Sequence, residues 1–126
     1  MTSSMVPVLE ALYARLGALG YTIYNHVPQG TAFPYIVIGN ATVIDDGTKT
    51  AFGESHSVLI QIYSRHRGEK EALDIASNVY DLLHEKLLAL TGHDNWRCRC
   101  EFGETLPEPD GLSVRVLRRY RIDTSQ

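Results

Sequence analysis

The sequence predicts an α+β fold, an antiparallel sheet of four to five strands with two helices packed on one face. Two segments show the apolar spacing of amphipathic helices, and the segments rich in β-branched and aromatic residues are separated by glycines and prolines. The predicted element order is α-β-β-β-α-β-β. A length of 126 residues suits one domain, so residues 1–126 are expected to form a single unit.

The first helix is expected from Met5 to Gly17, with Ser3 and Ser4 as candidate N-caps. Its apolar stripe consists of Leu9, Leu12, Tyr13 and Leu16. A short strand is expected from Tyr21 to His26, before a turn-rich connection.

A hairpin follows, with strands Tyr35 to Ile44 and Ser57 to Ser64 and a long loop from Asp45 to Glu54. Both strands carry apolar residues on alternate positions of both faces, which predicts strands that lie centrally or touch a partner.

An amphipathic helix is expected from Gly68 to Leu88, with acidic residues in its first turn as the helix dipole prefers. The final two strands are expected from Trp96 to Phe102 and from Leu112 to Ile122, joined by a loop rich in proline and glycine.

Composition excludes several classes of protein. With 44% hydrophobic and 21% charged residues, the chain is unlike collagen, disordered or disulfide-scaffold proteins. A net charge of −3 argues against a surface built wholly for nucleic acid or anionic lipid. We expect no signal peptide, no membrane span, and reduced cysteines at Cys98 and Cys100 that fill the core.

The last two strands carry the least ordinary pattern, because arginines alternate with apolar residues on both. Arg97 and Arg99 are expected to point away from the face that holds Trp96, Cys98, Cys100 and Phe102. If the strands pair with these faces aligned, five guanidinium groups share one face: Arg97, Arg99, Arg115, Arg119 and Arg121. Acidic residues gather in the connecting loop: Glu104, Glu108 and Asp110. This face is either a contact surface for a subunit or partner or a solvated sheet face, and a nucleic-acid-binding module is the alternative function.

The loop of the first hairpin is long enough to be a docking element. Its candidate contact residues are Asp45, Asp46, Lys49, Phe52 and Glu54. The spacing of the histidines, cysteines and acids matches no metal or nucleophile motif, so we expect no catalytic residue, no metal and no cofactor. A small enzyme remains a second alternative, because catalytic groups can assemble from distant residues.

Three segments together resemble a family of phage tail-completion proteins, also called tail terminators or tail-to-head joining proteins, of long non-contractile tails, prophages and gene transfer agents. The resemblance rests on residues 26–39, on the loop 46–53 and on the strand 57–64, with support from the helix 68–87 and the Pro109-Asp110-Gly111-Leu112 turn. It covers nearly the whole chain.

The resemblance implies a non-enzymatic virion protein, made and assembled in the host bacterial cytoplasm. It implies a ring of itself, with six subunits, at the head-proximal end of the tail. The implied partners are the major tail tube protein and the head-tail connector protein, with no membrane and no specific nucleic acid.

Overall fold

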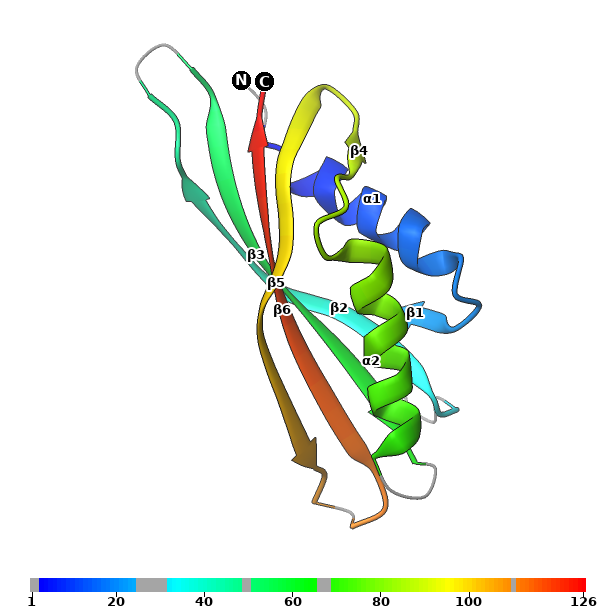
Figure 1. Cartoon of the computed structure of the whole chain (residues 1–126). Helices are drawn as coiled ribbons and strands as arrows, with labels where there is room; N and C mark the ends of the chain where they lie inside the picture. The colour runs from blue at the N-terminus through cyan, green and yellow to red at the C-terminus, as the bar shows by residue number, and fades with distance from the viewer. Residues whose placement is uncertain (1–2, 25–31, 49–50, 66–68, 110) are drawn as a thin grey trace.

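The computed structural model describes residues 3–24, 32–48, 51–65, 69–109 and 111–126, and these form one six-stranded sheet with two helices (Figure 1). The strand order across the sheet is β1-β2-β3-β6-β5-β4. The elements are α1 (Met5–Gly17), β1 (Thr22–Tyr24), β2 (Tyr35–Asp45), β3 (Gly53–Ser64), α2 (Lys70–Leu83), β4 (Ala89–Leu90), β5 (His93–Pro107) and β6 (Val114–Ser125).

The predicted fold class is wrong, because the sheet is mixed and has six strands rather than being antiparallel with four or five. β1 runs parallel to β2, with Thr22 opposite Tyr35 and Tyr24 opposite Val37. β4 is a two-residue strand that pairs with the start of β5 and was not predicted. Strands this short do not show the two-residue alternation of apolar positions by which a strand is predicted. The ten residues between Tyr24 and Tyr35 are close to the length that a parallel crossover needs.

Both helices pack on the same face of the twisted sheet (Figure 1). The buried side chains of α1 recur every four residues at Val8, Leu12 and Leu16, so one stripe of the helix faces the sheet. The sheet meets the helices with alternate residues such as Ile36, Ile60, Ile62, Val116, Tyr120 and Ile122, all fully buried. Burial of each large apolar side chain contributes roughly 1.5 to 3 kcal/mol, which makes this layer the main source of stability.

Helix α2 ends at Leu83, five residues before the predicted end. Glu85 has a positive φ of 60°, and its backbone N–H donates to the carbonyl of Cys98 at 2.7 Å. The backbone N–H of Cys100 donates to His84 Nδ1 at 3.1 Å. The chain therefore leaves the helix to cover part of the outer edge of β5, and Leu87, which lies within the predicted helix, is exposed.

The strands of both hairpins are longer than predicted. β3 begins at Gly53 rather than Ser57, so the β2–β3 loop shrinks to residues 46–52. β5 and β6 together span residues 93–107 and 114–125, and the hairpin they form projects at the end of the sheet opposite to the β2–β3 tip (Figure 1).

Candidate functional site

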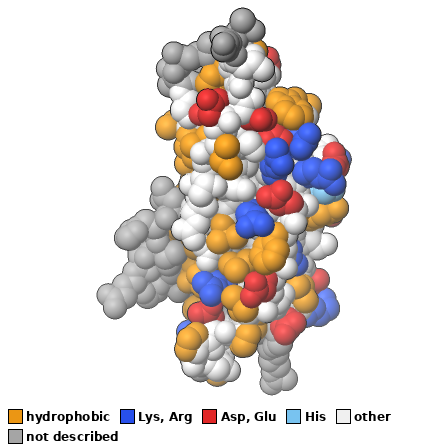
Figure 2. All heavy atoms as spheres, turned by 90° about the vertical axis from the view of Figure 1, so that its left-hand side faces the viewer, with side chains coloured by type: hydrophobic (Ala, Val, Ile, Leu, Met, Phe, Trp, Pro, Cys, Tyr) orange, Lys and Arg blue, Asp and Glu red, His pale blue; other side chains and the backbone are white. Residues whose placement is uncertain are grey.

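The face of the sheet that the helices leave open holds the five predicted arginines. Register places Arg99 opposite Arg121 and Arg97 opposite Asp123, while Arg115 and Arg119 lie at alternate positions of the same strand. We call this surface the open face. Figure 2 shows it as a mixture of basic, acidic and apolar side chains rather than a uniform basic patch.

Each of these five arginines forms an ion pair within the chain. The Nε to carboxylate distances are 3.3 Å for Arg97–Asp123, 3.6 Å for Arg99–Glu85, 3.0 Å for Arg115–Glu108, 3.4 Å for Arg119–Glu101 and 3.2 Å for Arg121–Asp123. The open face is therefore close to electrically balanced, and its charges are available to a partner only by exchange of these pairs.

Asp123 is the centre of this arrangement. Its carboxylate is fully buried and lies between the guanidinium groups of Arg97 and Arg121, which are each more than a third exposed. The Asn95 amide donates to the backbone carbonyl of Asp123 at 2.8 Å. A buried carboxylate between two guanidinium groups fixes both arginines in place.

Two irregularities in β5 move aromatic side chains to the surface. Register shifts occur between Asn95 and Arg97 and between Cys100 and Phe102. Trp96, predicted to point inward, is 48% exposed and packs on the Arg97 guanidinium, with 4.6 Å from Cζ to the ring centre. Phe102, also predicted inward, is 41% exposed and lies 5.1 Å from the Arg119 guanidinium. Each bulge inserts one residue, which reverses the alternation beyond it.

The predicted acidic loop is partly strand. Glu104 lies in β5, opposite Leu117 and exposed on the open face, whereas Glu108 lies at the turn and pairs with Arg115. Asp110 lies outside the described residues.

The predicted docking loop separates into two parts. Asp45 and Asp46 are exposed near the tip, and Asp45 accepts a hydrogen bond from the Gly47 backbone N–H at 2.9 Å. Phe52 is half-buried and packs on the His93 ring at 5.1 Å. Lys49 lies outside the described residues.

Glu54 holds the start of α1 instead of extending into solvent. Its carboxylate accepts from the backbone N–H of Ser4 at 2.7 Å, from Ser4 Oγ at 2.8 Å and from Ser3 Oγ at 3.0 Å. Burial alone would raise its pKa, but these hydrogen bonds and the neighbouring His56 outweigh burial and hold the pKa of Glu54 below its usual value.

His56 lies behind this carboxylate and is fully buried. Its Nε2 is 2.7 Å from Ser4 Oγ, which in turn is 2.7 Å from Thr124 Oγ1. Burial lowers the pKa of His56, and the opposing charges of Glu54 and Asp123 only partly compensate, so the ring favours its neutral form. This cluster joins α1 to β3 and β6 and belongs to the structure of the fold.

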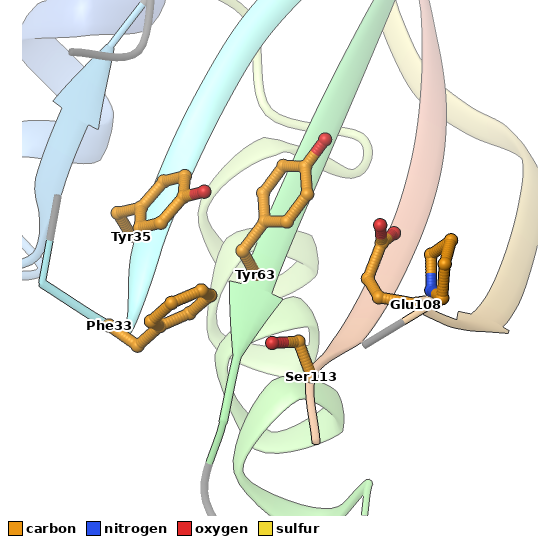
Figure 3. Close-up of a pocket in the computed structure, with 6 residues that line it drawn as sticks. Phe33, Tyr35, Tyr63, Glu108 and Ser113 are labelled. Atoms are coloured by element: carbon orange, nitrogen blue, oxygen red, sulfur yellow. The ribbon is translucent and has the colours of Figure 1, made fainter. Parts of the chain in front are cut away.

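A pocket of about 200 Å³ opens between the ends of β2 and β3 and the β5–β6 turn (Figure 3). It is lined by Phe33, Tyr35, Tyr63, Glu108, Pro109 and Ser113. The rings of Tyr35 and Tyr63 stack at 5.0 Å, and Phe33 tilts against Tyr35 at 5.2 Å. Burial, with Tyr63 and Glu108 nearby, raises the pKa of Tyr35. The pocket suits an apolar side chain with a polar end. The sequence alone did not predict it, because its walls come from segments that are distant in the chain and are brought together by strand pairing.

The sequence reasoning also missed Arg118. It pairs with Ile60 of β3 and Gly103 of β5, which places it on the helix side of the sheet, away from the other five arginines of the hairpin. There it lines a second hollow together with Leu73, Ala76, Ser77 and Tyr80 of α2.

Other chemistry is sparse in the described part of the chain. Among residues whose positions are described, no three His, Cys, Asp or Glu side chains gather as a metal site. No helix there is long and apolar enough to cross a membrane. Cys98 is buried, and burial raises the pKa of its thiol to about 11, which makes it a poor nucleophile.

Comparison with known proteins gives a family match and matches to solved structures. Residues 7–125 match the family described as "Tail completion protein gp17". A solved chain described as "Virion of native gene transfer agent (GTA) particle" has the same fold, with a TM-score of 0.89, 22% identity and 100% of each chain covered. No curated protein matches this chain.

Proposed function

Because the chain belongs to the tail completion protein gp17 family, as its sequence resemblance predicted, we propose that it forms a ring of six subunits at the end of a phage tail. In this proposal the ring caps the head-proximal end of the tail tube, stops its growth and joins the tail to the head connector. The protein is a structural component that acts by protein contacts, without catalysis or cofactor. Its partners are further copies of itself, the major tail tube protein and the connector protein.

The observation that carries the proposal is the extent of the match. The family model spans residues 7–125, which include the strands β1 to β6, all of α2 and most of α1. The likeness to the chain from the gene transfer agent virion covers both chains completely. Neither match is limited to a sub-domain that a protein of another function could share.

The surface of the molecule supports the ring. A ring needs two different patches on each subunit, so that one copy contacts the next head to tail. The chain has an open face with balanced ion pairs and aromatic rings, and a separate helix-covered side with its own hollow.

The alternative of nucleic-acid binding loses support from the same geometry. All five arginines on which it rested form ion pairs with acids of the chain. A phosphate would have to compete with a carboxylate at every position, which reduces the electrostatic gain of binding.

The test is deletion of the gene from the phage or prophage that carries it, with complementation by the wild-type gene. We expect electron micrographs to show separate heads and tails, or tails of abnormal length, and complementation to restore joined particles. Normal infectious particles from the deletion strain would refute the proposal.

A further inference from the structure

A groove of about 270 Å³ lies between α2 and the β5–β6 hairpin on the helix side of the sheet. Its apolar wall is formed by one side of α2, where Leu73 and Tyr80 are 38% and 43% exposed and Ala76 is buried. The Tyr80 ring is held from behind by a stack on the His84 ring at 4.3 Å. The groove is thus an apolar surface with a fixed wall.

Arg118 forms the other side of this groove. Its guanidinium lies across Gly103, where a Cβ would come within 2.7 Å of Nη1, so the absence of a side chain at Gly103 makes room for it. Its Nη1 donates to the backbone carbonyl of Leu117 at 2.8 Å. Unlike the five arginines of the open face, Arg118 has no carboxylate partner within the described ranges of the chain.

The complementary feature is the projecting end of the β2–β3 hairpin, residues 42–46, which we call the arm. All of its side chains are exposed, including Ile44 at 68%. Beyond Val37, no described strand pairs with the outer edge of β2. Asp46 follows Ile44 by two positions, directly after the end of β2. Within the described residues, neither aspartate of the arm forms an ion pair with a basic side chain.

We propose that the arm of one subunit docks in the α2 groove of a second copy, with Ile44 against Leu73 and Tyr80 and the Asp46 carboxylate paired with Arg118. The chemistry is complementary, because an exposed apolar residue followed two positions later by an acid meets an apolar wall beside a cation. The arm and α2 lie at opposite corners of the molecule (Figure 1), so one chain cannot fill its own groove.

The contact joins two different patches of the same chain. Such a contact is heterologous, and it closes into a ring when the rotation between copies permits. The inference rests on the ring in the proposed function and names the pair of surfaces that forms it.

The test uses charge reversal in the deletion strain, with joined, infectious particles as the readout. Arg118→Glu alone and Asp46→Arg alone each place like charges in the contact, and we expect each to lower the yield of joined particles at least about tenfold. The double variant in one chain restores the pair. Co-expression of the two single variants also restores it, because each arm then meets a groove of opposite charge in an alternating ring.

Matched controls separate the contact from general effects. Lys70→Glu reverses a charge on α2 at a side chain that is 85% exposed and is expected to leave the yield unchanged. Val43→Asn, on the opposite side of the arm from Ile44, is expected to have a smaller effect than Ile44→Asn. Purified variants are checked for unchanged thermal unfolding.

Normal yields from both single variants would overturn the inference. It would also be overturned if folded single variants failed and neither the double variant nor co-expression restored particles, because the groove would then contact another protein. In both cases wild-type complementation still tests the proposed function separately. If the wild-type gene did not restore joining to the deletion strain, the proposed function itself would fail.

Discussion

Glu54→Ala should destabilise the protein by removing the group that holds the first turn of α1. The Glu54 carboxylate accepts three hydrogen bonds from Ser3 and Ser4, and its side chain is only 14% exposed. Ser4 makes no capping bond with its own side chain, so this carboxylate substitutes for a local cap at the positive end of the helix dipole.

The expected loss of unfolding free energy follows from the groups that Glu54→Ala leaves without a hydrogen-bond partner. Ser4 Oγ keeps His56 and Thr124 as partners, but the Ser4 backbone N–H loses its charged acceptor. That loss, with the loss of a favourable charge at the helix start, amounts to roughly 2 to 3 kcal/mol of unfolding free energy. For a chain of this length, unfolding entropy near the midpoint converts this into a fall in Tm of about 8 to 11 °C.

Thermal unfolding followed by circular dichroism at pH 8 measures this difference. Glu101→Ala is the control, since Glu101 forms the exposed pair with Arg119 on the open face and its loss should cost under about 1 kcal/mol. Because the pKa of Glu54 is lowered in the fold, its contribution is complete above its ordinary value of 4.5 and disappears as the pH falls through the lower native pKa. A Glu54→Ala variant that melts within 1 °C of the control at pH 8 (about 0.3 kcal/mol) would refute the reasoning.

Three further outcomes are expected. The Tm should decrease as the pH falls below the ordinary histidine pKa of 6.5, because burial lowers the pKa of His56 in the fold and the unfolded chain then binds more protons. In a series of thermal melts at different pH values, His56→Gln should make the Tm depend less on pH. Asp123→Asn should lower the free energy of unfolding by about 1 to 2 kcal/mol in urea. The loss is smaller than for a wholly buried ion pair, because both arginines reach solvent. An unchanged urea midpoint would contradict this. In the native protein at pH 8, a thiol reagent should modify Cys100 and leave Cys98, whose pKa is raised to about 11, unmodified until denaturant is added.

The sequence was sufficient where structure depends on local spacing. The α1 helix begins and ends where predicted, because its apolar stripe is a signal within one segment, although its first turn is held by Glu54 rather than by a serine cap. It was insufficient where structure depends on pairing between segments. β1 and β4 have three and two residues, so neither their direction nor the existence of β4 follows from a period of two.

The candidate site shows the same division. Alternation correctly predicts that Arg97, Arg99 and Arg121 share a face, since they lie on the same side of paired strands. It fails at Trp96 and Phe102, because each lies at a bulge that no local residue pattern announces. The aromatic pocket could not be predicted either, since it depends on Tyr35 lying opposite Tyr63 in the register of β2 and β3.

Register also changes what the arginines can do. In the sequence, acids and arginines of the last hairpin occupy separate segments, which predicts a polarised surface. In the fold, Glu85 reaches Arg99 from the end of α2, and the bulged Glu101 reaches Arg119 within the hairpin. Exposed pairs of this kind contribute under about 1 kcal/mol each, so a partner can exchange them at little cost, and they provide specificity through position more than affinity.

Arg118 is the exception that follows from the same geometry. Alternation turns it toward α2, where no described acid lies within ion-pairing distance and an apolar wall limits water on one side. A cation in that setting gains more from an incoming carboxylate than an arginine already paired in solvent, because no internal pair has to break first. Arg118 is therefore a better position than the five paired arginines at which to test for contact between subunits.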